Sequence, residues 1–463
     1  MKTENKKESP KSLEELLVSG SSRDYLAFLK FYHEADIAEQ LTNLTEIERN
    51  TFFKKVNLEI ATDVLEELNI DQQIEFISKL KTEAAAKFIE EMEPDDAADL
   101  LEELSETNFT QAENIINALP EKEKTDIKTL LSYEEGSAGS LMTSEYLAIP
   151  ENLTVKEALD VIQKQDPPES ELSFYIFIIT KEKKLVGYTT LRDLVFSKSN
   201  SKIKSIRHEH HIVVNHFEDQ ESVAQLFQKY DMSVIPVVDN EDILLGAITV
   251  DDVVDVVVEE ATEDIYKLSG TATDDERNLI SDNIFKPIMY RIPWLIITIA
   301  GGILASLIIN SYSQKFQTNL FPLALSLSFI PLLMGLGGNV GNQSSAIIVR
   351  GLATGYVNPK ESLKILLREL FVGFGIGSII STCLFLINHY IYTYPIIFSL
   401  IVTISLFFNI LVAAFIGTTL PLLFHKLKID PAIASAPFIS TTLDIIGQLI
   451  YFYISIKCIS IFF

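Results

Sequence analysis

The chain changes character at Arg291, and this change limits what it can fold into more than any other feature. From that residue onward it consists of long apolar runs, each close to the roughly 20 residues that a helix needs to cross the hydrocarbon core of a bilayer. The runs lie at about 292–310, 320–349, 365–388, 394–424 and 431–456. We therefore predict that residues 286–463 form a membrane domain with five transmembrane helices.

Basic residues next to these runs indicate the orientation of the domain, because cytoplasmic loops carry an excess of Lys and Arg. An odd number of helices places the flanking residues on alternating sides. Eight then lie on one side and two on the other, the eight being Lys286, Arg291, Arg350, Lys360, Lys364, Arg368, Lys426 and Lys428 and the two Lys315 and Lys457. This predicts a multi-pass protein of the plasma membrane with a cytoplasmic N-terminus and a C-terminus outside.

The first 290 residues carry the acidic charge. Residues 291–463 hold nine Lys or Arg and four Asp or Glu, a net charge of +5. Since the formal net charge of the whole chain is −26, the first 290 residues carry −31. So acidic a segment is unsuited to nucleic acid, which needs clustered Lys and Arg. It suits a surface that attracts cations, although acidic surfaces also serve only to keep a protein soluble. The first seventeen residues lack the apolar stretch of a secretory signal, so we expect the acidic part to stay in the cytoplasm.

Residues 25–136, after a flexible N-terminus at 1–24, are predicted to form an acidic α-helical superhelical domain. The segment ATDVLEEL at 61–68 recurs thirty-six residues later as AADLLEEL at 97–104. This period is typical of a solenoid of helical hairpins. Just before the second copy, Glu93, Asp95 and Asp96 offer carboxylates to a cation, or serve only as acidic residues at the positive end of a helix.

A second repeat predicts a small α/β module used twice, at 137–200 and 201–250. GYTTLRDLV at 187–195 and GAITVDDVV at 246–254 lie fifty-nine residues apart, and each follows a β-branched run. Each copy is therefore expected to form a strand, a turn, a second strand and the start of a helix.

The second copy continues into an acidic helix, expected within a connecting segment at 251–285. Helical spacing places six carboxylates in two rows along this helix. The rows are Asp252, Asp255 and Glu259, and Glu260, Glu263 and Asp264. Like charges at this spacing repel, so a cation is expected to screen them, and Mg²⁺ binds through one or two carboxylates while it keeps its waters. The alternative is an acidic face that is merely solvated.

Polar residues inside the apolar runs are expensive to bury in a bilayer and therefore mark candidate functional positions. The second run contains the stretch MGLGGNVGNQS at 334–344, whose glycines allow close approach of backbones while its amides and hydroxyl offer oxygens. The candidates there are Asn339, Gly341, Asn342, Gln343 and Ser344. The stretch either lines a hydrated path or serves helix packing.

Asp444 is the strongest of these candidates. It lies fourteen residues after Asp430, about 20 Å along a helix and so well inside the bilayer. An unpaired carboxylate there costs about 2.5–3.5 kcal/mol on insertion scales, and no Lys, Arg or His lies deep in any run to neutralise it. A permeating cation is the expected partner.

Two positions earlier in the fifth run each have two interpretations. Asp430 offers a carboxylate, but Asp followed by Pro431 is also an ordinary start of a helix. Pro437 lacks an N–H and is expected to leave the carbonyl of Ile433 free for water or an ion, or else only to kink the helix.

Together these features resemble the MgtE family of magnesium channels over nearly the whole chain. The likeness rests on six motifs in this order rather than on any one of them. They are HEADIAE at 33–39, EPDDAADLL at 93–101, YEEGSAGSLMT at 133–143, the tandem module of the cystathionine-β-synthase (CBS) type, GGNVGNQS at 337–344, and DP at 430–431 with TTLD at 441–444.

The resemblance implies a homodimer in membrane lipid, with the pore on the two-fold axis and Asp444 coordinating a hydrated magnesium ion. Asp430, Pro437 and Thr441 belong to the same path. It also implies that the acidic domains bind cytosolic magnesium and hold a plug helix, about 251–270, against the pore when magnesium is plentiful. The candidate sensor residues are Asp95, Asp252, Asp255, Glu259 and Glu263. CBS pairs of the family also bind adenine nucleotide, so ATP is a further implied ligand.

Two rival interpretations stand beside this one. The chain can be a channel or carrier for another divalent ion such as Co²⁺ or Mn²⁺, which oxygen-only sites do not exclude. It can also be a membrane-anchored nucleotide sensor whose five helices only hold the CBS pair. An enzyme is not indicated, because the sequence contains no phosphate-binding glycine loop, nucleophile elbow or metal-hydrolase motif.

Overall fold

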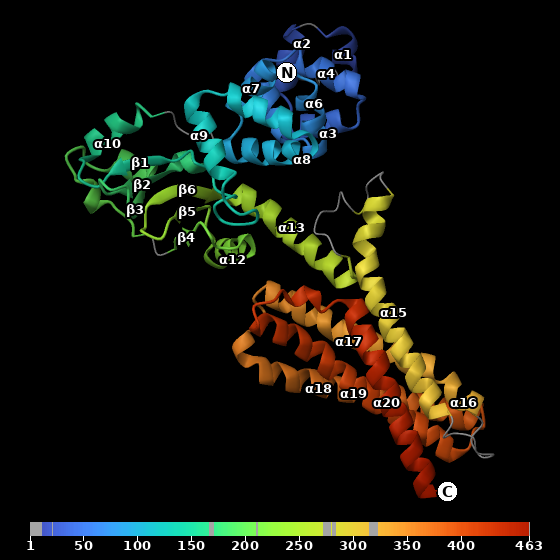
Figure 1. The fold of residues 1–463 in the computed structure, drawn as a ribbon. Helices are drawn as coiled ribbons and strands as arrows, with labels where there is room; N and C mark the ends of the chain where they lie inside the picture. Colours follow the sequence, from blue (N-terminus) through green and yellow to red (C-terminus); the bar gives the residue numbers. More distant parts are fainter. Residues whose placement is uncertain are drawn as a thin grey trace, which may run out of the picture. The chain divides into compact units, whose positions relative to one another are not determined.

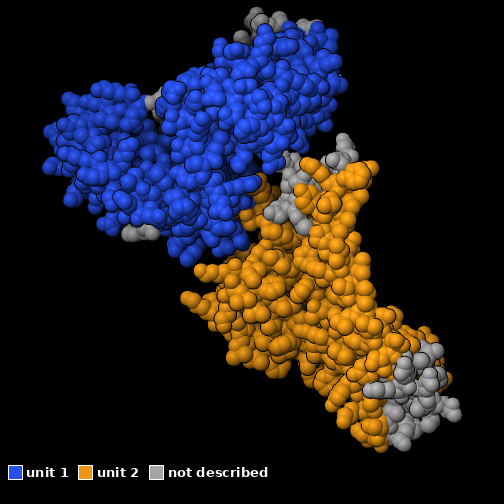
Figure 2. Space-filling model, viewed as in Figure 1, with its two compact units in different colours: residues 1–256 blue, residues 257–463 orange. Residues whose placement is uncertain are grey.

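The computed structural model describes residues 12–20, 22–165, 171–209, 212–271, 279, 284–313 and 323–462. The chain divides into two compact units, residues 1–256 and 257–463, coloured separately in Figure 2. The first unit holds a helical domain followed by paired α/β modules, and the second holds the long apolar helices (Figure 1). The boundary falls inside helix α13 (Val250–Ser269), whose two ends therefore belong to different units.

Helices, most of them short, form the N-terminal domain, as predicted. They are α1 (Leu13–Ser19), α2 (Ser22–Leu29), α3 (Glu34–Thr42), α4 (Glu46–Phe53), α5 (Leu58–Glu66), α6 (Ile70–Ser78), α7 (Thr82–Glu91), α8 (Pro94–Ala118) and α9 (Glu121–Leu130). Helix α8 is 25 residues long and is interrupted at Asn108. Capping side chains stabilise the first turn of several of these helices. Before α6, for example, the side chain of Asn69 accepts a hydrogen bond from the N–H of Gln72 (3.0 Å).

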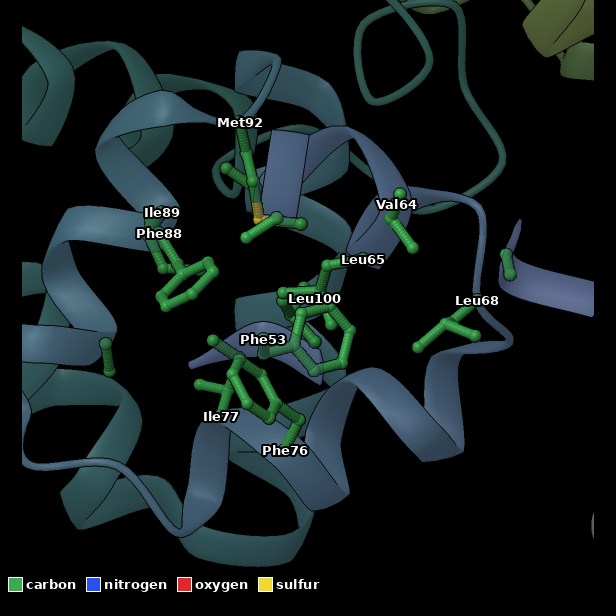
Figure 3. Packing of buried hydrophobic residues seen from close by; sticks show 14 of the residues in the cluster. Phe53, Val64, Leu65, Leu68, Phe76, Ile77, Phe88, Ile89, Met92 and Leu100 are labelled. Carbon is green, nitrogen blue, oxygen red and sulfur yellow. The ribbon is translucent and has the colours of Figure 1, made fainter. Parts of the chain in front are cut away.

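The core of this domain is made by one apolar face from each helix. In Figure 3, Phe53, Phe76 and Phe88 lie together, with ring centroids 4.4 Å apart for the first two and 5.2 Å apart for the last two. The repeated segments occupy α5 and α8, and equivalent positions such as Leu65 and Leu101 are both buried. The helical repeat seen in the sequence thus places the same positions of each copy in the core.

Helix α1 lies within the segment that was expected to be flexible. Residues 1–11 and 21 of that segment lie outside the described residues. The side chain of Ser12 accepts a hydrogen bond from the N–H of Glu15 (3.4 Å), and Leu13 and Leu16 are buried in the core of the domain. Burial of these two side chains orders a segment whose short local pattern alone did not predict a helix.

Two three-stranded sheets confirm the duplicated α/β module. In each sheet the first strand pairs parallel with the second, and the second antiparallel with the third. The first contains β1 (Leu147–Pro150), β2 (Tyr175–Ile179) and β3 (Leu185–Thr190), with α10 (Val155–Ile162) and α11 (Leu191–Phe196). The second contains β4 (Val214–Asn215), β5 (Val234–Val238) and β6 (Leu244–Thr249), with α12 (Gln220–Tyr230), and α13 follows β6 directly. Backbone bridges from Thr143 to Ala247 and from Lys184 to Ile243 join the two modules.

The second unit contains the helices predicted to cross the membrane. They are α15 (Phe285–Ser313), α16 (Leu323–Ser328), α17 (Ile330–Ala353), α18 (Ser362–Leu386), α19 (Ile396–Lys426) and α20 (Ala436–Phe462). Among the described residues, four helical stretches are both long and apolar enough to span a bilayer, namely Phe285–Tyr312, Pro359–Ile391, Ile396–Lys426 and Ala436–Cys458. Residues 320–322 of the predicted second run lie outside the described residues, and the rest of it forms α16 and α17. Helix α17 is 24 residues long, enough to cross, but its central glycines and amides lower its hydropathy.

Close packing of α17 on α19 depends on glycine. A Cβ atom on Gly417 of α19 would lie 2.2 Å from the carbonyl oxygen of Gly341 on α17. Because no rotamer change relieves a clash with backbone, Gly417→Ala should push the helices apart and cost about 1–3 kcal/mol of stability. Thermal unfolding of the purified protein measures this. Gly335→Ala is the matched control, since a Cβ there meets nothing within 4 Å, and equal melting temperatures for the two variants would contradict the close approach.

Candidate cation sites

Asp444 lies half-buried on α20. Ser440 lies one turn earlier on the same face, and its hydroxyl accepts a hydrogen bond from Nδ2 of Asn342 on α17 (3.1 Å). On a neighbouring face, Thr441 packs closely against Gly301 of α15. Within the described part of the chain, Asp444 forms no hydrogen bond or ion pair with another protein group. Its charge therefore lacks a protein partner there.

Asn342 adds a second oxygen without a partner. Its Nδ2 donates to Ser440, but its Oδ1 is buried and accepts no hydrogen bond from the residues that the structure describes. A buried acceptor left in this way costs about 1–3 kcal/mol. Asn342 thus brings an oxygen without a protein partner to the face of α20 that carries Ser440 and, one turn further on, Asp444. Oxygens of this kind suit a cation and its waters.

The other candidates on α17 divide between a packed side and an exposed side. A Cβ on Gly341 would lie 2.3 Å from Cδ1 of Leu443, so this glycine serves helix packing. Ser344 is buried, and its hydroxyl donates to Oε2 of Glu369 on α18 (3.4 Å). Asn339 and Gln343 are exposed on the surface of the single chain. Among the described residues of this group, Asn342 is the one whose side chain hydrogen-bonds to α20.

Pro437 has neither of the two backbone roles predicted for it, while its place on the ion path stays a prediction. Helix α20 begins at Ala436, so Pro437 lies in its first turn, where a missing N–H costs no hydrogen bond and causes no kink. The carbonyl of Ile433 is not free, because it accepts a hydrogen bond from the N–H of Ser435 (2.6 Å). The prediction was wrong because it ran the helix back through Pro431–Ile433, which form a separate 3₁₀ turn.

Both carboxylate oxygens of Asp430 have protein partners. Oδ1 accepts a hydrogen bond from the N–H of Ala432 (2.8 Å) and so caps the 3₁₀ turn. Oδ2 lies 2.9 Å from Nζ of Lys267 on α13, and the same ammonium pairs with Glu263 one turn earlier on that helix. Two residues predicted as metal ligands therefore share a lysine. The sequence did contain one sign of this ion pair. Glu263 and Lys267 are four residues apart, which is the spacing of an ion pair within a helix.

In the first unit, the predicted sensor residue Asp95 is buried in the first turn of α8, with its side chain among other acids. Only 7% of Asp95 is exposed, and its Oδ1 accepts no hydrogen bond among the described residues. Burial raises the pKa of Asp95 well above its ordinary value, and the charges of Asp252, Asp96 and Glu93 raise it further. Asp252 comes from the first turn of α13, where its carboxylate accepts a hydrogen bond from Thr249.

Glu66 joins this cluster although the sequence did not mark it. It comes from the end of α5, and its Oε1 accepts a hydrogen bond from the N–H of Glu93 (3.0 Å). Burial, and then the charge of Asp96, raises the pKa of Glu66 to about 8. Burial likewise raises the pKa of Glu93 to about 7 and that of Asp252 to about 7. No local pattern identifies Glu66, because only the packing of α5 against the later helices brings it here.

The remaining predicted sensor residues, Asp255 and Glu259, are exposed on α13. Partial burial and the charge of Asp251 raise the pKa of Asp255. Across the described ranges, no three His, Cys, Asp or Glu side chains are placed to hold a metal ion directly. A cation at the cluster around Asp95 would therefore have to keep most of its own waters, as Mg²⁺ does in many protein sites.

Models of known protein families match three parts of this chain. The family model described as MgtE, divalent cation transporter, matches residues 330–454, the MgtE intracellular N domain matches 32–136, and the CBS domain matches 138–199 and 203–259. The chain is 34% identical to the magnesium transporter MgtE of Thermus thermophilus over 444 residues, which are 95% of this chain and 96% of the relative. The chain belongs to the MgtE family. It is also 34% identical to MgtE of Bacillus subtilis over 73% of each chain.

A solved structure resembles about half of the chain. It is the cytosolic domain of the Mg²⁺ channel MgtE in complex with ATP, which matches 53% of this chain and 98% of its own length at 32% identity and a TM-score of 0.50. Members of the MgtE family are transporters and not enzymes. The chain is thus a membrane-embedded member of a magnesium-transporter family.

Proposed function

We propose that this MgtE protein is a Mg²⁺-selective channel whose acidic cytoplasmic part senses magnesium and closes the pore when magnesium is plentiful. The observation that carries the proposal is the cluster around Asp95, where carboxylates from α5, α8 and α13 face one another and one buried oxygen has no partner within the described residues. Their mutual repulsion opposes the compact arrangement, and a bound divalent cation relieves it.

Magnesium then acts as a ligand of the compact state. An ion that binds the compact arrangement better than the loosened one shifts the population toward it. Helix α13 begins at the cluster, where Asp252 lies in its first turn, and ends at Ser269 in the unit that holds the membrane helices. One continuous helix therefore connects the proposed sensor to the proposed pore. Asp255, Glu259 and Glu263 lie along it.

The proposed conduction path follows α20 and α17. Asp444 attracts a hydrated magnesium ion, and Asn342 and Ser440 contact its water shell. Asn339 and Gln343 are exposed on a membrane helix, where a polar side chain needs water or another protein surface. This supports a homodimer with the path at its two-fold axis. The distribution of basic residues supports a cytoplasmic N-terminus and an outward C-terminus in the plasma membrane.

ATP is proposed as a further ligand of the CBS pair, because the similar cytosolic domain was crystallised with it. Oxygen donors alone do not separate Mg²⁺ from Co²⁺ or Mn²⁺, so the choice of magnesium rests on the family.

Magnesium should protect the cytoplasmic part from proteolysis. Limited trypsin digestion of the full chain in detergent, in EDTA and in millimolar Mg²⁺, measures this, and we expect cleavage to slow several-fold when the ion binds. Potassium chloride at matched ionic strength is the control, because it screens charge without binding the cluster. Cleavage at the same rate in EDTA and in Mg²⁺ would count against magnesium sensing.

A further inference from the structure

The end of α13 is held against the membrane helices of its own unit by two neutral contacts. Nε1 of Trp294 on α15 donates a hydrogen bond to the carbonyl oxygen of Thr271 (3.2 Å). Gly270 ends the helix in the left-handed region, with φ of +81°, and lies so close to Pro437 that a Cβ would come within 2.4 Å of its ring. These contacts place the end of α13 beside Trp294 and Pro437, but they carry no charge.

The same junction collects several carboxylates. Glu263 and Asp264 on α13 approach Asp430, which precedes α20, and the charges of Asp430 and Glu260 add to burial in raising the pKa of Asp264 to about 6. The charge of Arg350 acts in the opposite direction on Asp264. Without a cation between α13 and Asp430, repulsion at the junction would favour separation.

Lys267 supplies that cation from within the chain. Its ammonium contacts Glu263 on its own helix and Oδ2 of Asp430 at 2.9 Å, and its side chain is only 25% exposed. An ammonium has three donors, so it can serve both carboxylates at once. Being attached to the chain, it also acts at a high effective concentration, whereas a free Mg²⁺ ion gives up its waters reluctantly.

We propose that Lys267 is the built-in counter-cation of Glu263 and Asp430, so that the end of α13 stays attached to the start of α20 without magnesium. This inference rests on the proposed gating and makes it more specific. Magnesium then controls the cluster around Asp95, and the junction around Asp430 is not one of its binding sites. Glu263 and Asp430 are accordingly removed from the set of magnesium ligands.

The single tryptophan of the chain reports on this junction. Because Trp294 contacts Thr271, separation of the α13 end should expose its indole to acrylamide. In the full-length protein we expect quenching of Trp294 to be low in EDTA and nearly unchanged by millimolar Mg²⁺. Lys267→Met keeps the length of the side chain and removes the charge. It should raise quenching in EDTA by two- to five-fold, the ratio expected for one partly buried ion pair. In this variant alone Mg²⁺ should reverse the rise, because without the ammonium the two carboxylates are free to attract the ion.

Two further variants keep the test decisive. Lys267→Arg retains the cation and should behave as the wild type. Asp430→Asn retains an oxygen that can cap the 3₁₀ turn but loses the ion pair, so it should raise quenching in EDTA. If Mg²⁺ lowers quenching in the wild type as much as in Lys267→Met, or if neither Lys267→Met nor Asp430→Asn differs from wild type in EDTA, the proposal is overturned. The fluorescence needs no ion flux, so failure of the proposed channel function would appear separately, in transport assays.

Discussion

Replacing Asp444 by Asn should strongly reduce magnesium transport while leaving the fold intact. Asn has nearly the same size and no charge, and among the described residues no protein cation faces this position. The substitution therefore removes an attraction for the permeating ion and not for a protein group. That attraction to one carboxylate amounts to several kcal/mol at an effective dielectric constant near 20. Part of that energy offsets the removal of water from the ion, so we expect flux to fall by about 100-fold. Uptake of Mg²⁺ into proteoliposomes measures the change.

Glu361→Gln is the matched control for Asp444→Asn. Glu361 is an exposed carboxylate just before α18, paired with Lys364 (2.9 Å), and its loss should leave transport at the wild-type rate. Wild-type flux through a stably folded Asp444→Asn protein would refute the pore role of this residue. A wild-type protein that binds nucleotide but carries no ion would favour the anchored sensor. Adding Co²⁺ or Mn²⁺ as competitors in the same assay tests the rival ions.

The stability of the magnesium-free protein should fall as the pH rises from 6 to 8. Burial raises the pKa values of Glu66, Glu93 and Asp252 to about 8, 7 and 7, and it raises that of Asp95 as well. In the unfolded chain these carboxyls titrate near pH 4, so the folded protein holds more protons between about pH 4 and 8. Their contribution is most favourable below about pH 4 and is lost as the pH rises through 7–8. We expect a loss on the order of several kcal/mol, seen as a lower melting temperature in EDTA.

Magnesium should reverse this loss, because the ion replaces the protons of the same carboxylates. Its affinity should therefore rise with pH, by up to about tenfold per unit for each proton displaced. Isothermal titration calorimetry in two buffers of different ionisation enthalpy counts those protons. An affinity that does not change between pH 6 and 8 would show that the ion binds elsewhere.

Asp95→Asn distinguishes magnesium binding at the cluster around Asp95 from a general effect of the acidic surface. Removing one buried charge should stabilise the magnesium-free protein at pH 8 by about 1–3 kcal/mol and weaken magnesium binding by roughly tenfold. Glu91→Gln is the control, because Glu91 is exposed at the end of α7 and its loss removes the same charge from a solvated position. Identical effects of the two substitutions would indicate general screening rather than a site.

Much of the architecture could be read from the sequence because its signals are local. Helical spacing of apolar residues predicted the N-terminal helices, and the duplicated motif at 187–195 and 246–254 predicted the two sheets. Long apolar runs predicted the membrane helices, although the polar centre of α17 makes it less apolar than the four stretches that meet the length and hydropathy of a span. The start of α20 was misplaced because an Asp-Pro pair begins a 3₁₀ turn as readily as an α-helix.

The candidate sites depended more on long-range contacts. Glu66 reaches Glu93 across 27 residues, and the cluster around Asp95 draws on carboxylates from three helices. Asn409 is a second example, since it appeared in the sequence only as one amide in an apolar run. It is buried on α19, donates a hydrogen bond to the carbonyl oxygen of Leu333 on α17 (2.6 Å) and contacts Gly447 of α20.

The sequence by itself determined the division into an acidic part and a membrane part, the repeated modules, and the presence of a carboxylate deep in the last apolar run. These follow from composition and periodicity, which act between neighbours in the chain. Only the tertiary structure decided which carboxylates have a protein counter-charge. Lys267 and Asp430 are far apart in the sequence yet form an ion pair, whereas Asp444 forms none among the described residues. Pairing depends on the distance between charges in space, and folding sets that distance.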